Sequence, residues 1–126
     1  MRTGHGSHVL PAFLLAAALG ALPARAADQP RTYQAAPETY KVIAERGQDR
    51  VIMVVWAPGH RDAWHSHPAA SGYFLTDCSL RFHFPDGRQV DQAIRAGAAF
   101  VQPATASHSV ENRSESECRL VMFERE

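Results

Sequence analysis

The chain has 126 residues, of which 45% are hydrophobic and 21% charged, and its 13 basic residues balance its 13 acidic ones. This length suits one domain with a single modest core. No basic run or stripe occurs, which excludes nucleic acid as a partner.

Residues 1–26 are predicted to be a secretory signal peptide. Arg2 precedes an apolar run at 9–22, and Ala24-Arg25-Ala26 has the small-x-small form of a cleavage site. The run is shorter than the roughly 20 residues of a membrane span, so a retained anchor is the alternative interpretation. Cleavage near Ala26 predicts a periplasmic or secreted protein with no membrane segment, carrying 11 basic and 13 acidic residues.

Residues 27–40 are polar with two prolines and are predicted to form a flexible N-terminal arm. Residues 41–126 then show the pattern of one domain built from short strands. The first two strands lie in 40–47 and 49–59, which are rich in β-branched residues and are separated by a Gly-Gln-Asp turn.

The second half of the chain continues this pattern. Residues 79–94 form a hairpin that turns at Pro85-Asp86-Gly87, with Leu80, Phe82 and Phe84 on one face. Residues 89–100 are ambiguous between helix and strand, but Gly97 interrupts them. Further strands follow at 98–104, 107–112 and 118–126. Eight or nine short strands with frequent turns predict an all-β antiparallel sandwich or barrel.

The two cysteines, Cys78 and Cys118, both lie in strand-like stretches. An exported chain meets an oxidising compartment, so they can form a disulfide. Two buried, inert thiols are the alternative, and a reactive thiol is a third interpretation that no C-x-x-C pattern supports.

Five histidines remain after the signal peptide, and two of them, His65 and His67, are separated by one residue. In a strand these two side chains point to the same face, roughly 7 Å apart. A metal ion is the commonest reason to place two neutral imidazoles together. A third ligand must come from another strand, and His108 is the best candidate.

These histidines lie in two motifs that resemble those of the cupin family. The stretch GHRDAWHSH contains Gly59, His65 and His67, and GAAFVQPATASHSVEN contains Gly97, Pro103, His108 and Asn112. The resemblance covers residues 45–124. It implies an antiparallel double-stranded β-helix (a jelly-roll barrel) with metal ligands in the barrel mouth. It also implies a homodimer.

Two positions depart from the family pattern. The first motif usually has a glutamate separated from the second histidine by three or four residues, where this chain has Ser71 and Gly72. The second motif usually has a glycine where this chain has Thr105. Without the glutamate, three neutral imidazoles would leave the full charge on a divalent ion. The site is therefore either a three-histidine centre, as in some cupin dioxygenases, or a site that has lost its metal and keeps a polar mouth of hydrogen-bonded histidines.

Other residues beside the motifs are candidates for the site. Gln102 is a weak ligand, a hydrogen-bond donor to substrate, or a surface glutamine. Trp64 and Tyr73 are possible pocket-lining residues, with a place in the core or outer shell as the alternative. Parity along the strands turns His60 and His83 away from the site, and Asn112 is expected to fix a turn.

The sequence therefore predicts a small exported protein that binds a divalent transition metal (Fe, Zn, Mn, Ni or Cu). It acts on a small organic molecule as a dioxygenase or isomerase. A non-catalytic barrel that binds a small ligand or a metal is the alternative, and a purely structural barrel is a third. No serine nucleophile motif, phosphate-binding loop or paired catalytic carboxylate occurs.

Overall fold

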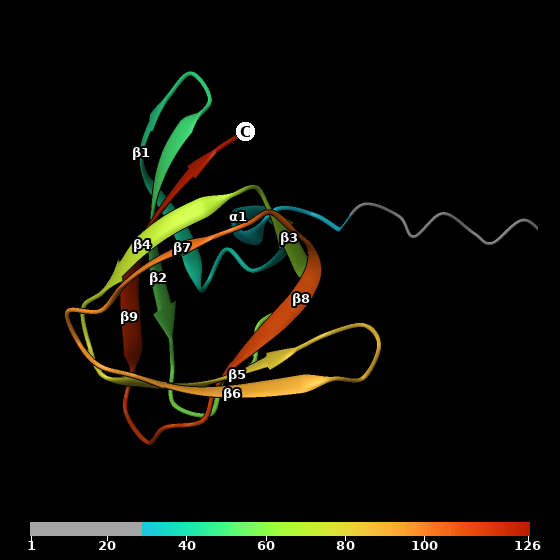
Figure 1. Cartoon of the computed structure of the whole chain (residues 1–126). Coiled ribbons are helices and arrows are strands. Elements are labelled where there is room, and N and C mark those ends of the chain that lie inside the picture. The colour runs from blue at the N-terminus through green and yellow to red at the C-terminus, as the bar shows by residue number, and fades with distance from the viewer. Residues whose placement is uncertain (1–28) are drawn as a thin grey trace, which may run out of the picture.

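A computed structural model describes residues 29–126 (Figure 1), so the predicted signal peptide lies outside the described residues. One short helix, α1 (Thr32–Ala35), precedes the strands. The strands are β1 (Tyr40–Arg46), β2 (Asp49–Trp56), β3 (His65–His67), β4 (Ala70–Phe74), β5 (Cys78–His83), β6 (Gln89–Ile94), β7 (Ala99–Gln102), β8 (Thr105–Asn112) and β9 (Cys118–Arg125). The predicted all-β class is confirmed. Among residues 29–126, no helix has the length and apolar character needed to cross a membrane.

The strands form two antiparallel sheets that face each other across a barrel. One sheet has the order β1-β2-β9-β4-β7, and the other has the order β3-β8-β5-β6. Apart from the β1–β2 and β5–β6 hairpins, successive strands alternate between the two layers, with β4 and β7 on one side of the interior and β5, β6 and β8 on the other (Figure 1). This is the predicted double-stranded β-helix.

Alternating residues fill the space between the sheets. In β2 the inward side chains Ile52, Val54 and Trp56 are almost fully buried. In β9 the inward residues are Leu120 and Met122. This period of two places one apolar face of each strand against the other sheet, and the burial of apolar area drives the assembly.

The segment 89–100, whose sequence left helix and strand open, consists of two strands. Residues 89–94 pair with β5, and residues 99–102 pair with β4. Gly97 lies between the two strands with a φ of +89°, a left-handed conformation that glycine adopts without steric cost. The turn there carries the chain from one sheet to the other.

Residues 29–40, which belong to the predicted N-terminal arm, pack against the barrel. Thr32 and Ala36 are buried, and the backbone N–H of Ser66 donates to the carbonyl of Pro30 at 2.9 Å. Arg31 forms an ion pair of 2.6 Å with Glu126 beyond the end of β9. The prolines made this segment resemble a linker, but contacts with residues distant in the sequence hold it in place.

A disulfide joins Cys78 to Cys118 and settles the three interpretations of the cysteines. Cys78 begins β5 in one sheet and Cys118 begins β9 in the other, so the bond links the two sheets. It closes a loop with a sequence separation of 40 residues. A loop of this length restricts the unfolded chain and contributes about 4 kcal/mol to stability.

Glu124 is the acidic residue that faces inward from β9. Its side chain is buried, and neither carboxylate oxygen has a hydrogen-bond partner. Burial, reinforced by the nearby charge of Glu126, raises the pKa of this carboxyl to about 7, although Arg31 and Arg50 act in the opposite direction. Between about pH 4.5 and pH 7, the folded protein therefore holds a proton on the Glu124 carboxyl that the unfolded chain has already released.

We predict that Glu124→Gln stabilises the protein at alkaline pH. The folded pKa lies above the unfolded one, so the wild-type protein loses stability as pH rises from about 4.5 to about 7. Urea unfolding at pH 9 should show the variant about 2 to 3 kcal/mol more stable, with little difference at pH 5. The exposed Glu117→Gln is the matched control and should show no such pH dependence. Equal stability of the Glu124 variant and wild type at pH 9 would contradict the assignment.

Candidate metal centre and ligand cavity

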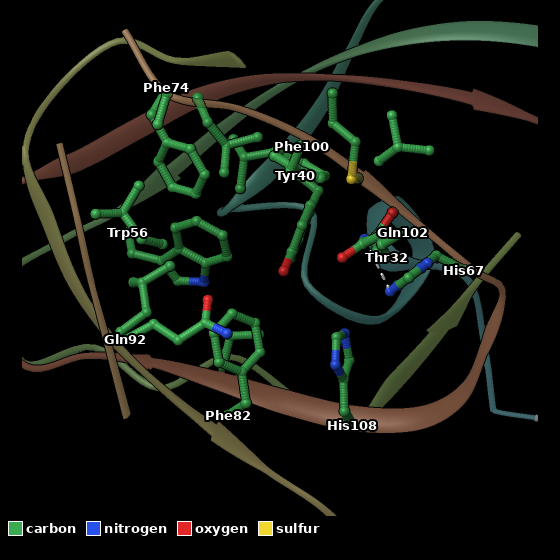
Figure 2. Close-up of a pocket in the computed structure, with 18 of the residues that line it drawn as sticks. Thr32, Tyr40, Trp56, His67, Phe74, Phe82, Gln92, Phe100, Gln102 and His108 are labelled. Atoms are coloured by element: carbon green, nitrogen blue, oxygen red, sulfur yellow. Dashed lines mark hydrogen bonds between the residues drawn. The ribbon is translucent and has the colours of Figure 1, made fainter. Parts of the chain in front are cut away.

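A cavity of about 370 Å³ lies between the two sheets (Figure 2). Its walls come from both sheets and from helix α1. The lining residues are Thr32, Tyr40, Val54, Trp56, His65, His67, Phe74, Leu80, Phe82, Gln92, Ile94, Ala98, Ala99, Phe100, Val101, Gln102, His108, Val110, Leu120 and Met122. This volume lies at the lower end of the range for small-molecule sites.

The three histidines that the sequence singled out meet at one end of this cavity. His65 and His108 are direct partners across β3 and β8. The ring centroid of His108 lies 4.7 Å from that of His65 and 4.9 Å from that of His67, and the rings of His65 and His67 are 6.3 Å apart. The β3–β8 register shifts between His65 and His67, which bends this short strand.

Backbone carbonyls orient two of the imidazoles. Nδ1 of His65 lies 2.8 Å from the carbonyl of Ala63, and Nδ1 of His67 lies 2.8 Å from the carbonyl of Pro68. A carbonyl only accepts, so each Nδ1 carries the proton and each Nε2 presents a lone pair. Nε2 of His65 is buried and has no hydrogen-bond partner. Both tautomers present an unprotonated Nε2, which is the form in which histidine binds metals.

The site favours neutral histidines. Burial lowers the pKa of His65 and of His67. Burial, together with the charges of the other two histidines, lowers the pKa of His108 to about 3. The imidazoles are therefore unprotonated at neutral pH, and a metal ion would not have to displace protons from them.

The donor chemistry fits a metal ion, but the side chains are not arranged as a finished coordination group. Within residues 29–126, no set of three or more His, Cys, Asp or Glu side chains has the geometry to hold an ion. The case for a metal ion therefore rests on the unpartnered Nε2 of His65 and on the fixed tautomers of His65 and His67. Coordination of one ion by all three imidazoles requires movement of these side chains.

Gln102 faces this site and is not a surface glutamine. Its Nε2 lies 3.3 Å from Nε2 of His67, and Figure 2 shows the two side chains together at the cavity end. Because Nε2 of His67 is unprotonated, the amide N–H donates to its lone pair. Gln102 thus occupies the coordination direction of His67, directly across from Ala70 on the neighbouring strand.

The structure shows what fills the space of the missing motif glutamate. Gly72, and not Ser71, is the buried position of β4, and it faces the interior with Ala70 and Phe74. A Cβ at Gly72 would lie 2.5 Å from the ring of Phe100 and 2.7 Å from the carbonyl of Val121. Phe100 therefore fills the space that a side chain from position 72 would need, and Ser71 points away from the cavity.

Trp64 and Tyr73 do not line the cavity. Both are exposed, and Trp64 stacks under the guanidinium of Arg61 at 5.3 Å. His60 and His83 also lie outside it, as their parity predicts. His83 is nevertheless buried, and the carboxylate of Glu111, 2.8 Å from its Nε2, provides the hydrogen-bond partner that a buried imidazole needs.

Asn112, predicted to fix a turn, is fully buried. Its amide donates to the carbonyls of Trp56, Ala57 and Ser116, and its oxygen accepts from Ser114. The side chain thus ties β8 to the end of β2 and to the turn before β9.

Asp62 is the important residue that the sequence did not identify. Its buried carboxylate accepts hydrogen bonds from the Tyr40 hydroxyl at 2.7 Å, from the Trp56 indole at 2.9 Å and from the backbone N–H of Val110 at 2.7 Å. One of its oxygens also lies 3.6 Å from Nδ1 of His65. Asp62 lies in the irregular segment between β2 and β3, so no periodic pattern marks it.

Tyr40 was also missed, because the sequence placed it at the end of the arm. Tyr40 lines the cavity wall (Figure 2), and its hydroxyl donates to a carboxylate oxygen of Asp62. Burial, followed by the charge of Asp62, raises the pKa of Tyr40 well above its usual value. Tyr40 therefore keeps its proton, which it donates to Asp62.

We predict that Asp62→Asn destabilises the fold by about 3 kcal/mol in urea unfolding. An amide cannot accept on both sides, so at least one of the three buried donors loses its partner. The matched control is Asp91→Asn, which breaks an exposed ion pair with Arg81 and should leave the stability almost unchanged because solvent screens the pair. Equal losses in the two variants would show that Asp62 does not organise the site.

Comparison with known proteins gives one consistent match. The family model for the cupin domain matches residues 52–124. A cupin domain from Bordetella pertussis Tohama I has a TM-score of 0.64 and 23% identity, over 78% of this chain and 96% of that chain. A conserved protein with a double-stranded β-helix domain from Klebsiella pneumoniae has a TM-score of 0.55 and 18% identity, over 68% of this chain and 74% of that chain. At these identities the structures show the shared fold alone, and no curated protein matches the chain.

Proposed function

The chain belongs to the cupin domain family, and from this premise we propose that it binds a divalent transition metal through His65, His67 and His108. The observation that carries the proposal is the buried, unpartnered Nε2 of His65 beside two further neutral imidazoles. A lone buried acceptor costs stability unless something binds to it. A metal ion is the partner that all three side chains share.

The three histidines would leave open coordination positions toward the cavity. An ion of this kind supplies Lewis-acid polarisation of a substrate oxygen, and a redox-active ion adds chemistry toward dioxygen. The cavity supplies the binding site for a small organic molecule. An oxygenase or isomerase is therefore the class of enzyme that we propose.

The second candidate is a non-catalytic barrel that binds a small ligand or a metal. It is favoured by one observation, the absence of any acidic side chain from the cavity lining. The Tyr40 hydroxyl donates its proton in a hydrogen bond to Asp62, so it is not available as a general acid or base for a ligand in the cavity. Turnover of a small molecule by the metal-loaded protein, with or without oxygen consumption, separates the two candidates.

We predict that the purified protein binds about one equivalent of a transition metal, measured by elemental mass spectrometry and by calorimetric titration. His65→Ala and His108→Ala should each weaken binding by more than 100-fold, since loss of a hydrogen-bond partner behind a ligand already costs roughly 10- to 100-fold. His60→Ala is the matched control and should leave the affinity unchanged. No uptake of Fe, Mn, Zn, Ni or Cu by the wild-type protein would exclude the proposal.

Gln102 gives a second arm to the same experiment. Gln102→Glu places a carboxylate beside His67, and the added charge should tighten metal binding by at least about tenfold. Gln102→Leu removes the amide without adding charge. An unchanged affinity in Gln102→Glu would place the ion away from His67.

We also propose that the protein is exported. The Cys78–Cys118 disulfide supports this proposal, because disulfides persist in oxidising compartments such as the periplasm. The signal-like segment 1–26 supports it independently.

We further propose a homodimer through the outer face of the five-stranded sheet. One row across this face consists of Val51, Phe123, Ser71 and Val101, which are neighbours in the strand register. The side chain of Val101 is 88% exposed and that of Phe123 is 48% exposed. An apolar row of this kind is typical of an interface.

We expect a dimer in sedimentation velocity, because a second copy would cover this row. Val101→Glu should shift the protein toward monomer by placing a charge in the interface. Val90→Glu on β6, outside the row, is the control. A wild-type protein that stays monomeric at the highest soluble concentration would contradict the proposal.

A further inference from the structure

The cavity has two chemically different ends. At one end lie the aromatic side chains Trp56, Phe74, Phe82 and Phe100 together with the amide of Gln92, and at the other lie His67, His108, Thr32 and Gln102 (Figure 2). Tyr40 lies between the two groups. A ligand that fills the cavity must therefore be amphipathic along its length.

The apolar end favours a flat or branched hydrocarbon group. The rings of Phe74 and Phe100 are 5.7 Å apart with an interplanar angle of 56°. Leu80, Ile94 and the indole of Trp56 complete this part of the wall. The Trp56 N–H is already bound to Asp62, so these groups offer a ligand apolar contact, and the Gln92 amide is the one polar group that the described chain adds at this end.

The polar end contains a second orphaned atom. Oγ1 of Thr32 is buried and has no hydrogen-bond partner, and Thr32 lines the cavity beside His67 and Gln102. The Thr32 side chain is only 1% exposed. A buried hydroxyl without a partner is a donor available to a ligand oxygen.

The lining has no charged side chain, and this decides which sign of charge the ligand head group should carry. None of the lining residues is Lys, Arg, Asp or Glu. The nearest buried carboxylate, Asp62, lies on the Nδ1 side of His65 and would offset part of the charge of an ion without binding it. An ion held by three neutral imidazoles would keep the rest of its positive charge inside a largely apolar cavity, which is costly without an anion. An anionic oxygen at this end would offset that charge and accept the Thr32 hydrogen bond at the same time.

From these observations we propose that the cavity binds a small organic acid with an apolar, preferably aromatic, body. The anionic oxygen of its carboxylate or enolate lies at Thr32 and the three histidines, and the body lies among Trp56, Phe74, Phe82 and Phe100. This inference rests on the proposed metal site. The volume of about 370 Å³ equals roughly a dozen waters of about 30 Å³ each, which is enough for one ring and a short chain.

The test uses the full protein loaded with Co²⁺, whose absorption spectrum reports directly on new ligands. Metal binding is measured first, without any acid. Titration with 3-phenylpropionate should then change the cobalt spectrum and give a saturable binding isotherm. Acetate, which has the head group alone, and 3-phenylpropionamide, which lacks the charge, should bind at least about tenfold more weakly.

Two variants locate the ligand. Thr32→Val keeps the shape of the side chain and should weaken 3-phenylpropionate at least about tenfold, the size of one hydrogen bond to a charged group, while cobalt affinity stays unchanged. Ile94→Phe fills the apolar end and should block the acid without affecting cobalt. Ala93→Phe, on the exposed opposite face of the same strand, is the matched control and should bind normally.

The outcomes separate the two proposals. Cobalt binding without any response to 3-phenylpropionate would overturn this inference and leave the metal site standing. Equal binding of the acid and its amide would overturn the anionic head group. Failure to bind cobalt, zinc or the other ions would overturn the metal site and this inference with it.

Discussion

The buried carboxylate of Asp62 is the constraint on which the site depends. A charge in the interior is tolerable only when hydrogen bonds replace its hydration, and Asp62 receives them from Tyr40, Trp56 and the backbone of Val110. These three donors belong to β1, β2 and β8. One side chain thus joins both sheets at the point where the chain leaves β2 and approaches His65. These hydrogen bonds fix the path of the irregular segment between β2 and β3, in which Asp62 lies.

That network also separates two kinds of polar group in the interior. The polar atoms around Asp62 satisfy one another and have a structural role. The orphaned atoms, Nε2 of His65 and Oγ1 of Thr32, lie on the cavity side of the same region. Of the four described side chains with a buried, unpartnered polar atom, Thr32 and His65 line the cavity, whereas His60 and Glu124 lie elsewhere. The unsatisfied groups of the cavity therefore stand beside a polar network that is complete.

The sequence predicted those features that depend on local pattern. Alternation along β2, β5 and β9 gave the strands, and the spacing of His65, His67 and His108 gave the side chains that meet. It did not predict features that depend on contacts between distant segments. The ordered path of residues 29–40 comes from contacts with Ser66 and Glu126. The role of Gly72 comes from a ring on the adjacent strand β7, and the position of Gln102 follows from the register of that strand. No periodicity within one segment contains this information.

The cavity wall combines Thr32, near the beginning of the described chain, with Met122, near its end. Nearly the entire domain must be present before the cavity exists. The folding chain has no enclosed space until β9 has closed the sheet between β2 and β4. Occupation of the cavity therefore follows completion of the polypeptide, and no shorter fragment of the barrel can serve as a partial receptor.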